Sequence, residues 1–144
     1  MLLYHLQPTT DTKELVELLT LRLDNVERRA GIDAQFTVSV QADWPSAWNE
    51  SIFRIALEAL NNALKHSQAN AVLINLRSND QEVVLEVSDN GCGFDLDRKR
   101  GGMGLQNMLD RAERIYGRLM IDSKPGQGTR LCLKIQQKDV LTVL

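Results

Sequence analysis

A stripe of polar side chains runs along the otherwise apolar stretch FRIALEALNNALKHS, residues 53–67. At about 100° per residue, four of them fall on one narrow side of a helix: Arg54, Glu58, Asn62 and Lys65. A carboxylate and an amide oxygen one turn apart are ligands of the kind that Mg²⁺ takes while it keeps several waters. The stripe therefore predicts one wall of a metal-binding cleft. The simpler alternative is a solvated face on which Arg54 and Glu58 pair.

Two further polar residues lie in phase with the apolar faces of predicted strands. Asp89 ends EVVLEVSD, residues 82–89, and Thr129 begins TRLCLKI, residues 129–135. Strand side chains alternate between faces, so Asp89 shares a side with Val87. A carboxylate there is costly unless it is hydrogen-bonded. These positions predict the floor of a pocket at the strand ends. The alternative for Asp89 is a cap on its own turn, an Asx-turn.

Glycines dominate the segment that follows Asp89. Asn-Gly after a strand is typical of a hairpin, but residues 93–104, GFDLDRKRGGMG, show no alternation that would continue a sheet. The segment instead predicts a mobile loop, in which Gly91 and Gly93 allow the backbone to approach a ligand closely or to adopt φ > 0. A glycine-rich stretch before a helix N-terminus is typical of phosphate sites, and three glycines fit this pattern: Gly101, Gly102 and Gly104. The spacing matches neither a P-loop nor a dinucleotide-binding fingerprint.

The elements that must position these residues alternate between helices and strands. The predicted order is helix 11–30, strand 35–40, helix 46–66, strands 71–77 and 82–88, helix 105–117, and strands 118–123 and 129–135. Asp11 is the expected N-cap of the first helix and Gly31 its end. Phe36, Val38 and Val40 are expected on one strand face. The pattern predicts an α+β fold, a two-layer sandwich with the helices on one face of a mixed, mostly antiparallel sheet.

Composition narrows the class of protein. The chain has 144 residues, of which 43% are hydrophobic and 25% charged, as expected for one globular domain with its own core. The net charge of −2 does not favour nucleic acid as a partner. No apolar run is long enough for a membrane span, so no membrane contact is expected. Cys92, Cys132, His5 and His66 show no metal-ligand spacing, so neither zinc nor iron is expected.

Four motifs in order resemble those of the ATP-binding catalytic domain of sensor histidine kinases. EALNNALKH (58–66) is similar to the N box and DNGCGF (89–94) to the G1 box. GGMGL (101–105) resembles the glycine box after the lid, and GQGTRLCLKI (126–135) the closing strand. The short lid is most similar to the nitrate-sensor-type subfamily. The resemblance implies the Bergerat fold, which gyrase-like ATPases and Hsp90 share.

The resemblance also implies a role for each site residue. Asp89 would accept the hydrogen bond of the adenine amino group, and Thr129 would support that contact. Asn62 would hold Mg²⁺, and Glu58 lies where gyrase-like relatives carry the base that activates water. Gly91 and Gly93 would pass beside the base. The residues implied near the phosphates are Lys65, His66, Gly101, Gly102, Gly104 and Leu105.

The implied activity is transfer of the γ-phosphoryl group of ATP, with Mg²⁺, to a histidine on a separate dimerisation domain, and from there to a response regulator. Residues 1–10 are expected to be the end of that domain's last helix, 11–137 the catalytic domain and 138–144 a tail. His5 has no acidic neighbour after it, so the phosphoacceptor histidine is expected outside this chain. A cytoplasmic location and a monomeric isolated domain are expected.

Two alternatives remain. One is a relative with the same fold, either a gyrase-like ATPase or an anti-sigma-factor serine kinase, because Glu58 matches the base of the hydrolysing relatives. The short lid and the Lys65-His66 pair argue against it. The other is a nucleotide-binding or partner-binding module without turnover, although no motif position is visibly degraded.

Overall fold

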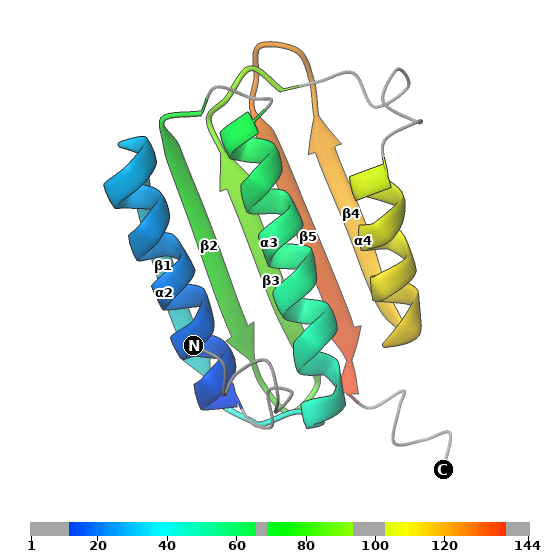
Figure 1. Ribbon diagram of the computed structural model, residues 1–144. Coiled ribbons are helices and arrows are strands. Elements are labelled where there is room, and N and C mark those ends of the chain that lie inside the picture. The colour runs from blue at the N-terminus through cyan, green and yellow to red at the C-terminus, as the bar shows by residue number, and fades with distance from the viewer. Residues whose placement is uncertain (1–11, 66–68, 94–102, 138–144) are drawn as a thin grey trace.

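A five-stranded mixed sheet with helices on one face forms the core of the computed structural model (Figure 1). The structure describes residues 12–65, 69–93 and 103–137. Its elements are α2 (Thr12–Ala30), β1 (Asp33–Val40), η1 (Ser46–Trp48), α3 (Asn49–Lys65), β2 (Ala71–Ser78), β3 (Glu82–Asp89), α4 (Met103–Arg114), β4 (Gly117–Ser123) and β5 (Thr129–Gln136). The strand order is β1-β2-β3-β5-β4. The predicted α+β sandwich is confirmed.

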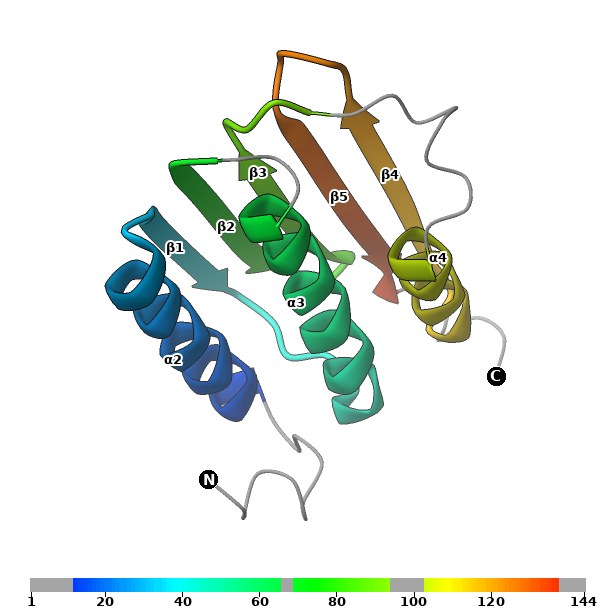
Figure 2. The same cartoon turned by 45° about the horizontal axis from the view of Figure 1, so that its top comes forward.

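The connection through α3 determines which elements meet at one edge of the sheet. β1 and β2 pair in parallel, and the other neighbouring strands are antiparallel. Parallel neighbours need a crossover, and α3 supplies it on the face that α2 and α4 also cover (Figure 2). The ends of α3, β3 and β4 and the starts of α4 and β5 therefore lie along the upper edge of the sheet in Figure 1.

The core lies between the sheet and the three helices. Alternate positions of the central strands are fully buried, among them Ile74, Leu76, Leu85, Leu133 and Ile135. On α3, Ile52, Ile55 and Ala56 are also fully buried, as expected of so apolar a helix. Burial of each large aliphatic side chain contributes roughly 1.5–3 kcal/mol. This packing holds α3 rigidly against the sheet.

Phe36, Val38 and Val40 share one face of β1, as predicted, but Val38 and Val40 are 40% and 39% exposed, because β1 is an outer strand of the sheet. Two local predictions differ from the structure. The second helix starts later than predicted, since a 3-10 turn, η1, precedes it. The helix predicted to reach Gly117 ends at Arg114, because the chain turns through Tyr116, whose φ is +59°. Gly117 is instead the first residue of β4.

Several predictions fall outside the described residues. They are the stub at 1–10, the N-cap Asp11, the end of the second helix at His66, most of the expected lid and the tail 138–144. The predicted end of the first helix agrees with the structure: Gly31 has φ +66°, and its N–H donates to the Glu27 carbonyl at 3.1 Å. No helix among the described residues is both long and apolar enough to cross a bilayer.

Candidate nucleotide-binding site

A cavity lies between α3, α4 and the end of the sheet. Its lining residues are Ala59, Asn62, Val87, Asp89, Leu105, Met108, Ile121, Thr129 and Leu131. The structure thus brings together Asn62 from α3, Leu105 from α4 and the two strand-end residues Asp89 and Thr129. The surrounding wall is mostly aliphatic. A cavity with apolar walls and a few convergent polar groups is the usual form of a small-molecule site.

The polar floor is a row of side chains across three strands. Asp89 on β3 is the direct register partner of Thr129 on β5, which in turn pairs with Ser123 on β4. The hydroxyl oxygens of Ser123 and Thr129 are 2.8 Å apart. Ser123 is buried and was not among the site residues predicted from the sequence. The available signal was its phase, because it shares a strand face with Ile121.

The carboxylate of Asp89 is oriented by its own turn. The Gly91 N–H donates to Oδ1 at 2.8 Å, which is the Asx-turn considered as the alternative. Asp89 therefore both caps its own turn and lines the pocket. Among the described residues, no donor reaches the second oxygen, and Asp89 lines the cavity. One oxygen is therefore fixed by the backbone, and the other remains available to a ligand.

Gly93 and Gly128 allow two turns to pack against each other. Their φ angles are +67° and +76°. A Cβ on Gly93 would collide with the Lys124 carbonyl, and one on Gly128 with the Asp89 carbonyl. The N–H of Gly126 also donates to the Cys92 carbonyl. The β4–β5 turn thus packs against the backbone of Asp89. The positive φ of Gly93 agrees with the sequence, whereas the sequence did not indicate the role of Gly128.

Glu58 lies against the beginning of α4. A Cβ on Gly104 would collide with the Glu58 carboxylate, so the two are in close contact. Glu58 is half-buried, whereas Arg54 is exposed. Among the described residues the one ion pair joins Arg77 to Glu86, so the alternative in which Arg54 and Glu58 pair on a solvated face does not hold. A carboxylate at a helix N-terminus is stabilised by the helix dipole, which explains where Glu58 goes instead.

The remaining predicted residues cannot be placed in the site. Lys65 is the last residue of α3, but its side chain lies outside the described part of the chain, as do His66, Gly101 and Gly102. Within the described part, no three His, Cys, Asp or Glu side chains gather to hold a metal.

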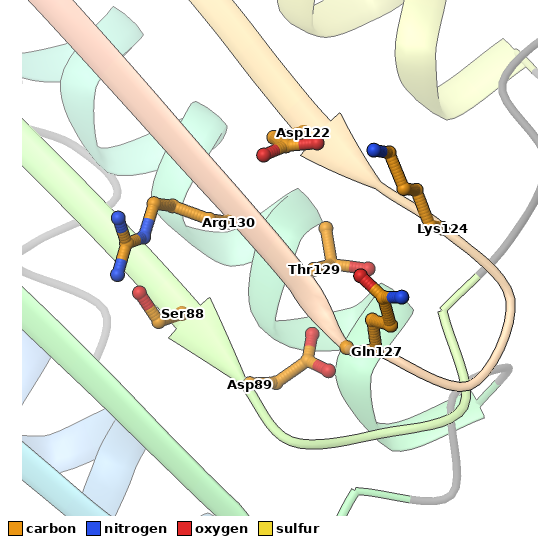
Figure 3. A pocket seen from close by; sticks show the side chains of 8 residues that line it. Ser88, Asp89, Asp122, Lys124, Gln127, Thr129 and Arg130 are labelled. Carbon is orange, nitrogen blue, oxygen red and sulfur yellow. The ribbon is translucent and has the colours of Figure 1, made fainter.

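A second, polar pocket lies behind the first. Its lining residues are Ser88, Asp89, Asp122, Lys124, Gln127, Gly128, Thr129 and Arg130 (Figure 3). Asp89 and Thr129 line both cavities. Ser88, Arg130 and Asp122 are register partners on the sheet face opposite the described helices (Figure 2). On the same face, burial and then the nearby Glu86 raise the pKa of the Cys132 thiol, which lines neither cavity.

Comparison with known proteins defines the class. A family model described as "Histidine kinase-, DNA gyrase B-, and HSP90-like ATPase" matches residues 49–139, from α3 to beyond β5. The chain therefore belongs to this family of ATP-binding domains. The domain is of the type found in sensor histidine kinases, because relatives that are 36% and 34% identical to it carry that name.

The sensor histidine kinase LiaS of Bacillus subtilis is 36% identical over 136 residues, which are 93% of this chain and 38% of LiaS. The oxygen sensor histidine kinase NreB of Staphylococcus carnosus is 34% identical over 116 residues, 78% of this chain and 33% of NreB. This chain thus spans about a third of the length of these relatives. The histidine kinase domain of the blue-light-activated kinase EL346 of Erythrobacter litoralis has the same fold, with a TM-score of 0.67 at 21% identity over 90% of this chain and 68% of that one.

Proposed function

We propose that this chain is the catalytic part of a two-component sensor kinase, which binds ATP with Mg²⁺ and passes the γ-phosphoryl group to a histidine on a separate dimerisation domain. The observation that carries the proposal is the convergence of Asp89, Thr129 and Asn62 on one aliphatic cavity. The phosphohistidine would then supply a response regulator. A cytoplasmic location and a monomeric isolated domain accompany the proposal.

Different residues of the cavity would contact different parts of the nucleotide. The free oxygen of Asp89 would accept a hydrogen bond from the adenine amino group, with Thr129 beside it and Gly91 alongside the base. The aliphatic side chains would cover the ring and exclude water. Phosphates would lie toward the start of α4, at Gly104 and Leu105, where backbone N–H groups and the helix dipole favour anions. Lys65, His66, Gly101, Gly102 and Gly93 keep the roles that the resemblance implies.

The residues present also fit a magnesium ion. Asn62 is half-buried and lines the cavity one turn from Glu58, and an amide oxygen with phosphate and water ligands is a usual Mg²⁺ environment. The ion would neutralise phosphate charge. Glu58, in contact with Gly104, would lie close enough to order water at this end. Catalysis in such transfers comes mainly from positioning and charge stabilisation.

Calorimetric titration with ATP, GTP and AMP, each with and without Mg²⁺, tests the binding step. Selection of ATP over GTP and dependence on Mg²⁺ are expected. The transfer step is tested with labelled ATP and a separately purified phosphoacceptor domain. Label that is lost in acid and kept in base identifies phosphohistidine. Acid-stable label on serine would contradict the proposal and favour the anti-sigma-factor type of kinase.

Asn62→Ala is expected to weaken binding of ATP with Mg²⁺ about tenfold or more, because a hydrogen bond or ligand to a charged group contributes roughly 1.5–3 kcal/mol. Binding of ATP without the metal should change less. The same titration measures both. Asn61→Ala is the matched control, since Asn61 is the neighbouring asparagine and is exposed. An equal loss with and without Mg²⁺ would refute the metal role of Asn62.

A further inference from the structure

The side chain of Asn90 bridges two parts of the chain. Its Oδ1 accepts hydrogen bonds from the backbone N–H groups of Asn70 and Ala71, both at 3.0 Å. Its Nδ2 donates to the Asn70 Oδ1 at 2.5 Å. The Asn90 backbone N–H donates to the Ala71 carbonyl at 3.3 Å. Three side-chain hydrogen bonds therefore hold residues 70–71 to the residue that follows Asp89.

The bridge lies where β1 and β2 begin and β3 ends. The β2–β3 register ends at the pair Val72 and Asp89. Beyond this pair, the backbone N–H groups of residues 70 and 71 do not bond to the backbone of β3. They donate instead to the side chain of Asn90. The Asn70 carbonyl in turn accepts the N–H of Asp33, where β1 begins. The Asn90 side chain thus adds to the backbone hydrogen bonds that hold the start of β2 in place.

The chain that enters β2 comes from α3. α3 ends at Lys65, only five residues before Asn70, and it carries Asn62 three residues before its end. Asp89 itself is held independently, by the ladders with β2 and β5 and by the Gly91 N–H. The Asn90 bridge therefore ties the backbone that follows Asp89 to the backbone that follows α3, in addition to the packing of α3 on β2 and β3.

We propose that Asn90 is a positioning residue, which sets the spacing between the adenine-selecting carboxylate of Asp89 and the Asn62 end of α3. The inference rests on the proposed function, because it concerns how one nucleotide satisfies both ends of the cavity. A ligand that contacts both ends depends on their spacing, and a misplacement of about 1 Å between reacting groups can cost as much as a hundredfold in rate. A ligand that contacts only the Asp89 end does not depend on it.

Three variants of the full chain separate the contributions of the individual hydrogen bonds of the Asn90 side chain. Asn90→Ala removes all three side-chain hydrogen bonds. Asn90→Asp keeps the acceptor for both backbone donors, and the Asn70 amide can turn to donate to its second oxygen. Asn70→Ala removes only the bond between the two side chains. Each is titrated calorimetrically with ATP plus Mg²⁺ and with adenosine, well below its unfolding temperature, and amide hydrogen exchange is followed at residues 70, 71 and 91.

Asn90→Ala is expected to weaken binding of ATP with Mg²⁺ about tenfold, and binding of adenosine less than about threefold. Asn90→Asp and Asn70→Ala should stay within about threefold of the wild type for both ligands. In Asn90→Ala the amides of Asn70 and Ala71 should exchange faster, while that of Gly91 stays protected. This split between ligands, together with rescue by Asn90→Asp, is not expected of a general loss of stability.

Equal losses for ATP and adenosine, or a failure of Asn90→Asp to restore binding, would overturn the positioning role and leave the proposed function intact. Unchanged ATP affinity in Asn90→Ala would do the same. Wild-type protein that binds neither ligand would overturn the proposed function and the inference with it. In that case the exchange data would still show whether the bridge holds residues 70–71.

Discussion

Asp89→Asn is expected to abolish the thermal stabilisation that ATP gives to this domain. The Gly91 N–H donates to Oδ1, so in the variant the amide oxygen must stay there and the amide NH₂ faces the cavity. Two donors, the amide and the adenine amino group, would then oppose each other. A buried donor without a partner costs about 1–3 kcal/mol, in addition to the lost hydrogen bond. The fluorescence of Trp44 and Trp48, both buried, reports unfolding with and without ATP.

Asp122→Asn is the matched control. It makes the same change of charge on β4, which β5 separates from β3, but Asp122 is exposed and lines the polar pocket, not the cavity that contains Asn62. Its ATP-dependent stabilisation should equal that of the wild type. If Asp89→Asn bound ATP with unchanged affinity, the adenine assignment would be wrong.

Gly128→Ala is expected to have the largest effect on stability, a loss of about 3 kcal/mol. An alanine at φ +76° is strained by roughly 1–2 kcal/mol. Its Cβ would also meet the Asp89 carbonyl, and a main-chain oxygen cannot rotate away as a side chain can. Urea denaturation measures the free energy of unfolding, and the midpoint should fall at an unchanged slope.

The neighbouring Gly126 isolates the steric part of this effect. Its φ is +81°, but a Cβ there would meet nothing within 4 Å. Gly126→Ala should therefore lose only the conformational part, about 1–2 kcal/mol. Equal losses in the two variants would mean that the approach of the β4–β5 turn to Asp89 does not matter. Because Gly128→Ala pushes on the Asp89 backbone, it should weaken ATP binding as well, whereas Gly126→Ala should not.

The parts of the fold that follow from local periodicity were predictable from the sequence. The alternation in β3 and β5 placed Asp89 and Thr129 on the core face, and the structure makes them direct register partners. The polar stripe of α3 likewise predicted that Asn62 faces a cleft, and Asn62 lines the cavity at the end of the sheet. These properties depend only on the repeat of one element and on which of its faces is apolar.

The parts that depend on contacts between distant segments were not predictable. Nothing in the sequence indicates that Gly128 approaches the Asp89 carbonyl, or that the Glu58 carboxylate rests on Gly104 instead of pairing with Arg54. The exposure of Val38 depends on its strand being an outer one. The bridge from Asn90 to Asn70 spans twenty residues. Each of these features depends on how different elements pack against one another. The residue pattern within one element carries no information about that packing.

The hydrogen bonds around Asn90 also bear on the chemical ageing of the domain. Asn-Gly is the sequence at which asparagine deamidates most readily, because the following backbone nitrogen attacks the side-chain amide, releases ammonia and forms a succinimide. Here that nitrogen belongs to Gly91, whose N–H is bonded to Asp89, and the Asn90 amide is bonded to Asn70 and Ala71. Folded protein should therefore deamidate much more slowly at residue 90 than protein unfolded in urea. Peptide mapping by mass spectrometry after incubation at 37 °C measures both rates, and equal rates would contradict this protection. The fold that presents Asp89 to a ligand would thereby also preserve the residue beside it.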